Sequence, residues 1–403
     1  MLCIVNSRSL ALVFQLFLLA VFLLLSLDAQ ARVVRDPQLA ELVATMARLP
    51  AEPPEDAPSR GAGPDLANAK HQLRDWIAFQ LKIGDFSDAR RGSAKSISAY
   101  LRHRLKAAGI GPFGISAWRS GPLVVVSTSF RIACGTDDSF YGWFWDGRSW
   151  VRSFAYERDD YAGMYQPLSL DSVRLAADGS SEAAGYYVLG SAVGTWCSSN
   201  WLGRMYQLFH VDGVSGRGAL LADEDLFAFA AEGDRETELT ADHAVIKYTG
   251  DTVDGRKTPM RDSLVMYRLS GGHASRVPMA AADAEDYAEK WLTAPHFIGN
   301  RSQLASWWQT LYAYMAKRES TSAEWSSTGP AARCRDDAKL LQFPLVFERS
   351  PVRSTSGQGA VPANATTESH TVYFLIRQDG RHSFSMQDIR SAPRKHCPVL
   401  EER

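Results

Sequence analysis

The sequence predicts a mainly β protein with helical flanks, and three patterns lead to that prediction. Residues 123–130 (LVVVSTSF) are rich in β-branched side chains, as is typical of a buried strand. Before and after the β-rich region, apolar residues recur at helical spacing. Four segments have the pattern strand, tight turn, strand, and their turns are Asp146-Gly147, Asp212-Gly213, Gly271-Gly272 and Asp379-Gly380. These residues supply the positive φ angles that hairpin turns require.

The amino-terminal segment has the layout of a secretory signal. Residues 10–27 form an apolar run, preceded by Arg8 and followed by the small-residue site Ala29-Gln30-Ala31. We expect cleavage after Ala31 and an exported product, in the periplasm or outside the cell. An uncleaved membrane anchor is the alternative, because a run of this length could just span a bilayer. No comparable apolar run follows, so we expect no transmembrane segment after signal removal.

Helix signals follow the predicted signal. Asp36-Pro37 is a pattern of helix starts, with Asp at the N-cap and Pro at the first helical position. The Pro-rich stretch that ends at Pro64 predicts an extended linker. Two further helices, starting at Asp65 and Ser93, predict a helical hairpin whose second helix is stopped by Gly109.

Helical spacing returns near the carboxy-terminus, at residues 281–293 and 302–317. We therefore expect five parts: a signal peptide at 1–31, a short helix and linker at 32–64, a helical hairpin at 65–115, an antiparallel β domain at 116–280 and an α+β domain at 281–403. The hairpins of the β domain are compatible with propeller blades that carry insertions. An antiparallel sandwich uses the same turns, so both architectures remain open.

Cysteine usage indicates an oxidising compartment. Four cysteines follow the signal, an even number that allows three pairings. We expect the local disulfides Cys134–Cys197 and Cys334–Cys397, because each pair closes within one predicted domain. The closely spaced cysteine and histidine pairs of a zinc site do not occur, so we expect no metal.

Charge and motifs narrow the function classes. The chain has 44 basic and 45 acidic side chains and a net charge of −1, which does not favour a nucleic-acid partner. It contains no Walker A, HExxH or GxSxG sequence. The G-x-G-x-x-G match at 109–114 follows a helix instead of a strand, unlike a dinucleotide-binding loop. We expect no cofactor.

Adjacent carboxylates are the candidate catalytic groups. Glycosidases use two carboxyl groups held several ångströms apart, and Asp137 and Asp138 are the first candidates for such chemistry. Neighbours in a strand point to opposite faces, however, so this pair could supply only one member of a catalytic dyad.

Aromatic side chains are the candidate binding groups. Trp143, Trp145, Trp201 and Asn200 could stack on sugar rings or hold an aromatic-rich peptide if they are exposed. The alternative is that these rings form the sheet core.

Several short motifs resemble those of a group of secreted bacterial proteins without an assigned activity. They are CGTDDSFYGWFWDG, TWCSSNW, the run from YRLSGGHASRVP to EKWL, and the closing Cys397-Pro398, and the resemblance spans about residues 65–400. It implies export but no catalytic residues. We expect a binding or assembly module without catalysis, whose partner is an envelope or extracellular protein or glycan. The alternative is a carbohydrate-active hydrolase that uses loop carboxylates.

Overall fold

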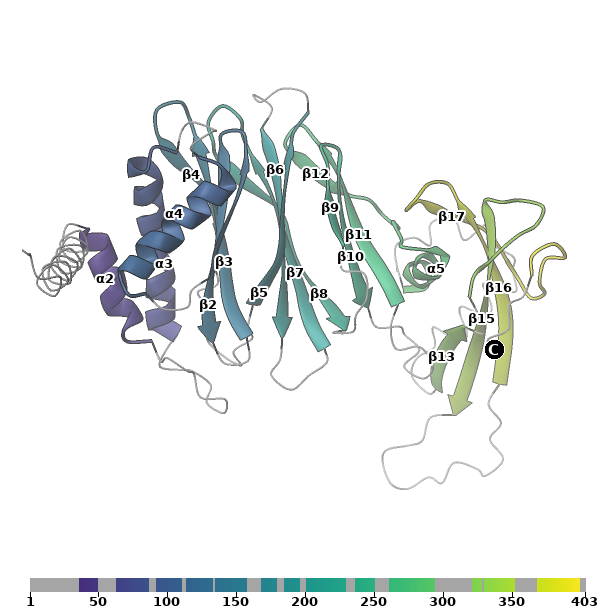
Figure 1. Cartoon of the computed structure of the whole chain (residues 1–403). Helices are drawn as coiled ribbons and strands as arrows, with labels where there is room; N and C mark the ends of the chain where they lie inside the picture. The colour runs from purple at the N-terminus through teal and green to yellow at the C-terminus, as the bar shows by residue number, and fades with distance from the viewer. Residues whose placement is uncertain are drawn as a thin grey trace, which may run out of the picture. The chain divides into compact units, whose positions relative to one another are not determined.

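The computed structural model confirms a mainly β fold with helical flanks (Figure 1). It divides into two compact units, one made of residues 1–199 and 205–224 and the other of residues 200–204 and 225–403. The described residues are 36–49, 63–86, 92–110, 114–132, 135–157, 168–179, 185–195, 201–229, 236–250, 261–293, 321–327, 330–351 and 368–398. The predicted signal peptide at 1–31 and the predicted helix at 302–317 lie outside them. None of the helices within these ranges is long and apolar enough to cross a bilayer.

The first unit has three described helices: α2 (Pro37–Met46), α3 (Gly63–Ile83) and α4 (Ala94–Ala107). Two of them start at the caps that the sequence predicts. The Asp36 carboxylate accepts a backbone N–H at the start of α2 at 3.1 Å, and the Ser93 hydroxyl does the same for α4. Gly109 ends α4 with a φ of +76°, which costs glycine little. α3 starts two residues before the predicted cap Asp65.

One large sheet forms most of the rest of the first unit, and the start of β7 and the end of β8 fall in the second unit. Its strands are β1 (Gly114–Ser120), β2 (Leu123–Ile132), β3 (Gly135–Trp145), β4 (Trp150–Tyr156), β5 (Leu168–Ala177), β6 (Tyr186–Thr195), β7 (Trp201–Val211) and β8 (Gly218–Phe229). The order is β1-β2-β3-β5-β6-β7-β8, and β4 also pairs with β3. β2 pairs with residues 135–144 along one edge of β3, and the other edge of β3 is shared between β4 and β5. Residues 140–145 pair with β4, whereas Asp137 pairs in parallel with Leu168 of β5. We call this divided edge the fork.

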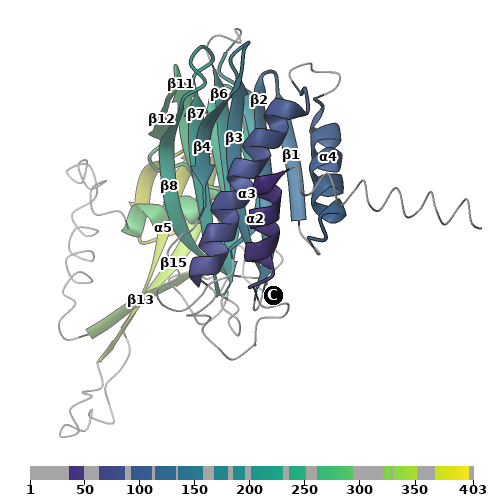
Figure 2. The ribbon, with the colours of Figure 1, turned by 90° about the vertical axis from the view of Figure 1, so that its left-hand side faces the viewer.

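β3 is buried on both faces. Tyr141 and Trp143, which are 0% and 1% exposed, lie in the core cluster that the helices share with β2. Figure 2 shows α2, α3 and α4 against one face of the sheet. Phe140 and Phe144 lie in a second cluster, with residues of β5, β6 and β7. The alternation of side chains along a strand therefore places half of this strand in each core.

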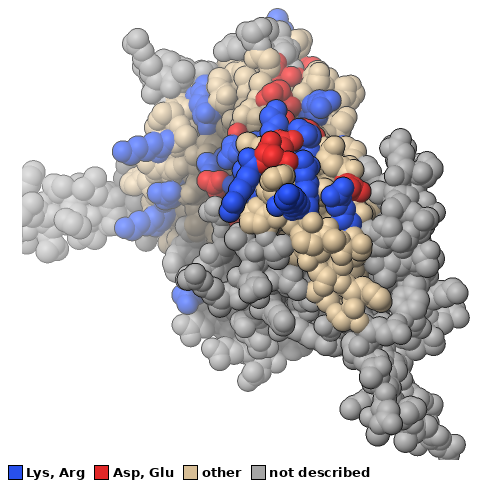
Figure 3. Space-filling view, turned by 90° about the vertical axis from the view of Figure 1, so that its right-hand side faces the viewer, with Lys and Arg blue, Asp and Glu red and all other residues tan. Residues whose placement is uncertain are grey.

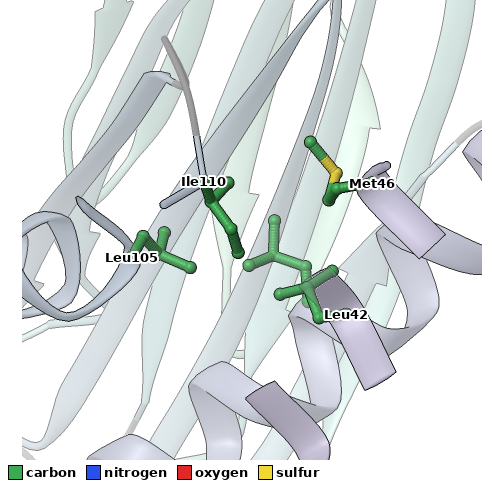
Figure 4. Close-up of a pocket in the computed structure, with 5 residues that line it drawn as sticks. Leu42, Met46, Leu105 and Ile110 are labelled. Carbon is green, nitrogen blue, oxygen red and sulfur yellow. The ribbon is translucent and has the colours of Figure 1, made fainter. Parts of the chain in front are cut away.

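The three helices also pack on one another. Leu42 and Met46 of α2, Leu73 of α3, Leu105 of α4 and the following Ile110 converge on one point (Figure 4). The space among them is too small to hold a water molecule. This contact is therefore ordinary apolar core and offers no ligand site.

The second unit contains two sheets and one described helix. One sheet has the order β12-β11-β10-β9, and the other has the order β13-β15-β16-β17 with β14 also paired to β15. The elements are β9 (Thr237–Leu239), β10 (His243–Gly250), β11 (Arg261–Ser270), β12 (His273–Arg276), α5 (Ala284–Thr293), β13 (Thr321–Ser327), β14 (Ala332–Arg333), β15 (Leu340–Pro351), β16 (Glu368–Gln378) and β17 (Phe384–Arg390).

α5 joins the two sheets of the second unit. Its apolar side, including Tyr287, packs against β15 and β16. Its polar side contacts β11, where the Asp286 carboxylate accepts the Ser263 hydroxyl at 2.7 Å. The Lys290 ammonium donates to the Leu264 carbonyl at 2.7 Å and to Asp286 at 2.7 Å. These contacts place β9–β12 with the carboxy-terminal elements, so the unit boundary falls at 225 whereas the sequence predicts a domain boundary at 280.

The four predicted hairpins form, and they are divided among three sheets. β3–β4 and β7–β8 lie in the large sheet, β11–β12 in the second and β16–β17 in the third. Gly271 and Gly272 both have positive φ, as a two-residue hairpin turn requires. In the second hairpin the positive φ falls on Gly216 instead of Gly213, because the loop is longer. The hairpins thus do not form a series of equivalent four-stranded blades.

The burial of Trp143 gives a first prediction. Trp143→Ala should lower the free energy of unfolding by about 3–5 kcal/mol, because it removes a large side chain from a packed core. Urea denaturation followed by circular dichroism measures this change. A loss below about 1 kcal/mol would show that the ring is not in a closed core.

Candidate functional site

The aromatic candidates do not form an exposed face in the described residues. Trp143 is 1% exposed, so its ring cannot stack on a ligand at the surface and lies in the core, as the alternative expectation has it. Trp145 is half-buried, and its ring contacts Trp150 with centroids 5.6 Å apart. Trp201 begins β7, but its side chain is not among those described, and Asn200 lies outside the described residues.

Asp137 is held in a buried ion pair. Its carboxylate lies 3.1 Å from the ammonium of Lys70 on α3, and the two side chains are 2% and 0% exposed. Water that could be activated for hydrolysis has no access to a pair so enclosed. The contact joins α3 to β3, because separating two buried charges that pair with each other costs free energy.

Asp138 points to the opposite side of β3. Its carboxylate accepts the N–H of Leu170 at 2.6 Å. Burial raises the pKa of Asp138 above its ordinary value, and hydrogen bonds from Ser129, Leu170 and Thr136 partly oppose that rise. The two adjacent carboxylates therefore sit in separate environments and do not form a dyad, as strand alternation requires.

A second group of polar side chains links α3 to the sheet. Arg74 of α3 pairs with Glu157, which also lies 3.4 Å from the Nε2 of His71. Burial raises the pKa of the Tyr141 hydroxyl well above its ordinary value, so this phenol stays protonated at neutral pH. The cluster is a set of neutralised charges that couples helix to sheet.

The second unit contains one of the two predicted disulfides. Cys334 and Cys397 are bonded, and their separation of 63 residues makes this a long covalent loop. Both cysteines are buried, at 3% and 5%, and pack on Leu340 and Leu375. This is the face of the third sheet opposite the one that α5 covers. Cys134 and Cys197 lie outside the described residues.

Basic side chains gather around this disulfide. One follows Cys334, two precede Cys397, and the others lie on the adjoining turn and on β16 and β17. We call the set the basic surface: Arg335, Lys339, Arg377, Arg390, Arg394 and Lys395, with Asp336, Asp337 and Asp388 among them. Arg333 also adjoins Cys334, but it pairs with Leu341 and so belongs to the other face of the sheet. Six positive charges minus three negative ones leave a local charge of +3, although the whole chain carries −1. Figure 3 shows Lys and Arg grouped around a few acidic side chains on this side of the molecule.

Three of these arginines are paired with carboxylates. Arg377 contacts Asp337 at 2.7 Å, Arg394 contacts Asp336 at 2.7 Å and Arg390 contacts Asp388 at 2.8 Å. The Lys339 N–H lowers the pKa of Asp337 most, and Arg377 lowers it further, so this carboxylate stays ionised.

The other exposed cations of the surface are available to a ligand. The side chains of Arg335, Lys339 and Lys395 make no ion pair within the described ranges, and all three residues are exposed. An anion that approaches this surface therefore finds charges that are not already neutralised.

The geometry around the sulfurs also bears on metal binding. Cys334, Asp336 and Cys397 place their potential ligand atoms within 4.8 Å of one another. A metal would need the thiolate form of the cysteines, and in the disulfide both sulfurs are already bonded. The oxidised protein therefore offers a charged surface here instead of a metal centre.

The net charge of the whole chain gives no sign of this surface. The signal is local: both cysteines of the second pair have basic neighbours, in Arg333-Cys334-Arg335 and in Arg394-Lys395-His396-Cys397. Once a disulfide joins these segments, their charges must lie close together. A predicted disulfide thus also predicts which charges become neighbours.

Comparisons with known proteins add little to this geometry. No protein-family model matches the chain, and no curated protein matches it. Among solved structures, the chain is similar to a protein from a complex described as "BT0996 RGII", with 9% identity and a TM-score of 0.21. The match covers 72% of the present chain and 90% of the other. At this TM-score the similarity carries no argument about function.

The buried ion pair gives a second prediction. Lys70→Met should lower the free energy of unfolding by about 3–5 kcal/mol, because it removes the ammonium that pairs with the buried Asp137 carboxylate. The double variant Lys70→Met/Asp137→Leu should recover most of that loss, since neither charge of the pair is then buried. Urea denaturation of the three proteins tests both statements. A double variant as unstable as the single one would show that the charges do not compensate each other.

Asp138 gives a third prediction, on pH dependence. A carboxyl group whose pKa is raised in the folded state favours folding in its protonated form, so its ionisation opposes folding increasingly as the pH rises above the ordinary pKa, and fully above the raised pKa. Asp138→Asn removes the charge and keeps an oxygen to accept the Leu170 N–H. Its melting temperature should therefore be higher than that of the wild type at pH 7, and the difference should shrink as the pH falls toward 3.8, the ordinary value. Thermal melts across this pH range measure it, and a lower melting temperature at pH 7 would contradict it.

Proposed function

We propose that the protein is an exported binding module that holds an anionic envelope or extracellular ligand on its basic surface, without performing catalysis. The observation that supports this proposal is the group of exposed cations around the Cys334–Cys397 bond. Arginine is well suited to the role, because its planar guanidinium presents paired donors to carboxylate, sulfate or phosphate.

Rigidity of the surface supports the same proposal. Its cations are carried by strands and by segments that a disulfide closes, so the backbone that carries them is in place before a ligand arrives. Binding then orders side chains but not the backbone. The surface also has few carboxylates relative to its cations, and those present hold arginine side chains in place.

The partner class follows from surface chemistry. The large exposed apolar side chains among the described residues are Phe79, Ile83, Val214 and Leu220, all in the first unit. The basic surface thus offers charge without an apolar group to insert into a bilayer, which favours a water-soluble anionic partner over a lipid surface. A carbohydrate-active hydrolase has less support, since Asp137 is paired with Lys70 and Asp138 faces the other way.

Dextran sulfate and neutral dextran provide a matched pair of probes, because they share a backbone and differ in charge. The wild type should bind dextran sulfate and not dextran in biolayer interferometry. The triple variant Arg335→Ser/Lys339→Ser/Lys395→Ser should bind about tenfold more weakly, if each exposed charge contributes about 0.5 kcal/mol. Added salt should weaken wild-type binding, since the contacts are exposed.

A second triple variant serves as the control. Lys82→Ser/Lys95→Ser/Lys106→Ser removes the same charge from exposed positions of α3 and α4 in the first unit. It should bind dextran sulfate like the wild type. If both triple variants lose affinity equally, binding reports overall charge and the basic surface is not the site. If the wild type binds dextran and dextran sulfate alike, the proposal fails.

A further inference from the structure

We infer that the Cys334–Cys397 bond assembles the basic surface, so that oxidation of the two cysteines raises the affinity of the protein for anions. This inference rests on the proposed function and adds its regulation. The two segments that carry the surface charges are remote in sequence, and the disulfide joins them across 63 residues. Without that bond, Arg335 and Lys395 belong to separate parts of the chain.

The segment after β17 has weak attachments besides the disulfide. Residues 391–398 form neither strand nor helix. The Arg335 N–H donates to the His396 carbonyl at 2.8 Å, and Arg394 forms its ion pair with Asp336. Both partners of that ion pair are 35% exposed, so water and salt weaken it.

Gln342 supplies a further attachment. Its buried amide accepts the N–H of Arg394 at 2.7 Å and donates to the carbonyl of Cys397 at 3.3 Å. Gln342 lies on β15 and is 1% exposed, so it can hold the segment only when the segment already lies over the sheet. The disulfide keeps it there, because the sulfurs are buried against Leu340 and Leu375.

Reduction should therefore release the segment and disperse its charges. Arg394 and Lys395 would leave the neighbourhood of Arg335 and Lys339, and Asp336 would lose its arginine partner. The surface would then have fewer cations within reach of one ligand and an additional free carboxylate. Both changes disfavour an anion.

The chemical step is thiol–disulfide exchange with an oxidised dithiol oxidoreductase. One cysteine thiolate attacks the disulfide of the oxidant and forms a mixed disulfide, releasing one thiolate of the oxidant. The second cysteine thiolate of the chain then attacks the mixed disulfide. The products are the Cys334–Cys397 bond and the reduced dithiol, and the chain has given up two electrons and two protons. Such oxidants act in export compartments, whereas the cytosol keeps thiols reduced.

The main test compares the full chain with the variant Cys334→Ser/Cys397→Ser. Dextran sulfate is the probe, and hydrogen exchange followed by mass spectrometry reports on residues 391–398. The variant should bind about five- to tenfold more weakly than the oxidised wild type. Release of residues 391–398 removes part of the cations from the basic surface, and the loss is similar to that in the triple charge variant. Faster exchange should be confined to residues 391–398 and the turn around Arg335. Unchanged binding in a folded variant would overturn the inference.

A redox titration of the wild type keeps the test decisive if that variant does not fold. The protein is equilibrated in glutathione buffers, its cysteines are alkylated, and the oxidised fraction of each is read by mass spectrometry. Binding should follow the oxidised fraction of Cys334 and Cys397. Binding that is constant across the titration, or that follows Cys134 and Cys197 instead, would overturn the inference while leaving the proposed function intact. If the oxidised wild type itself does not bind dextran sulfate, the proposed function fails as well.

Discussion

A β-sheet has two faces, and each must be covered by apolar side chains or made polar toward water. This constraint shapes both units. In the large sheet, helices cover one face of β3, and side chains from β5, β6 and β7 cover the other. In the third sheet, α5 covers one face. On the opposite face, the described residues form a small apolar cluster around Cys334 and Cys397, and charged side chains surround it. The candidate site therefore lies on a sheet face whose described residues are mostly polar around a small apolar centre.

Elements that depend on a few neighbouring residues can be predicted from the sequence. The helix caps at Asp36 and Ser93, the glycine that ends α4, and the hairpin at Gly271-Gly272 depend on a few neighbouring residues, and the structure shows them as predicted. The pairing of Cys334 with Cys397 was also accessible, because domain-sized separation favoured it. What local signals could not supply was the sheet order. The pairing of Asp137 with Leu168 joins strands across a long connection, and no pattern in either strand specifies its partner.

The candidate site illustrates the same limit. From the sequence, Asp137 is a reasonable catalytic candidate. In the structure, Lys70, 67 residues earlier, pairs with it and neutralises its charge. The sequence also cannot decide whether Trp143 is exposed. An aromatic strand has the same composition whether its face is open to water or covered by α3. The basic surface can be predicted from the sequence only if the Cys334–Cys397 disulfide is assumed, because that bond brings the basic residues next to each cysteine close together. The net charge of the whole chain does not reveal such a local group of basic residues.

The fork on β3 has a consequence for how the large sheet holds together. β1–β4 form one local meander and β5–β8 another, and among the described residues the backbone ladder between them is the pair Asp137 and Leu168. Side chains add to this connection: the ring of Phe140 lies where a Cβ on Gly190 of β6 would come within 2.2 Å of it. A larger residue at position 190 would therefore wedge the two meanders apart. Cooperativity across this sheet thus depends on steric fit, and each meander is a natural folding unit with low contact order.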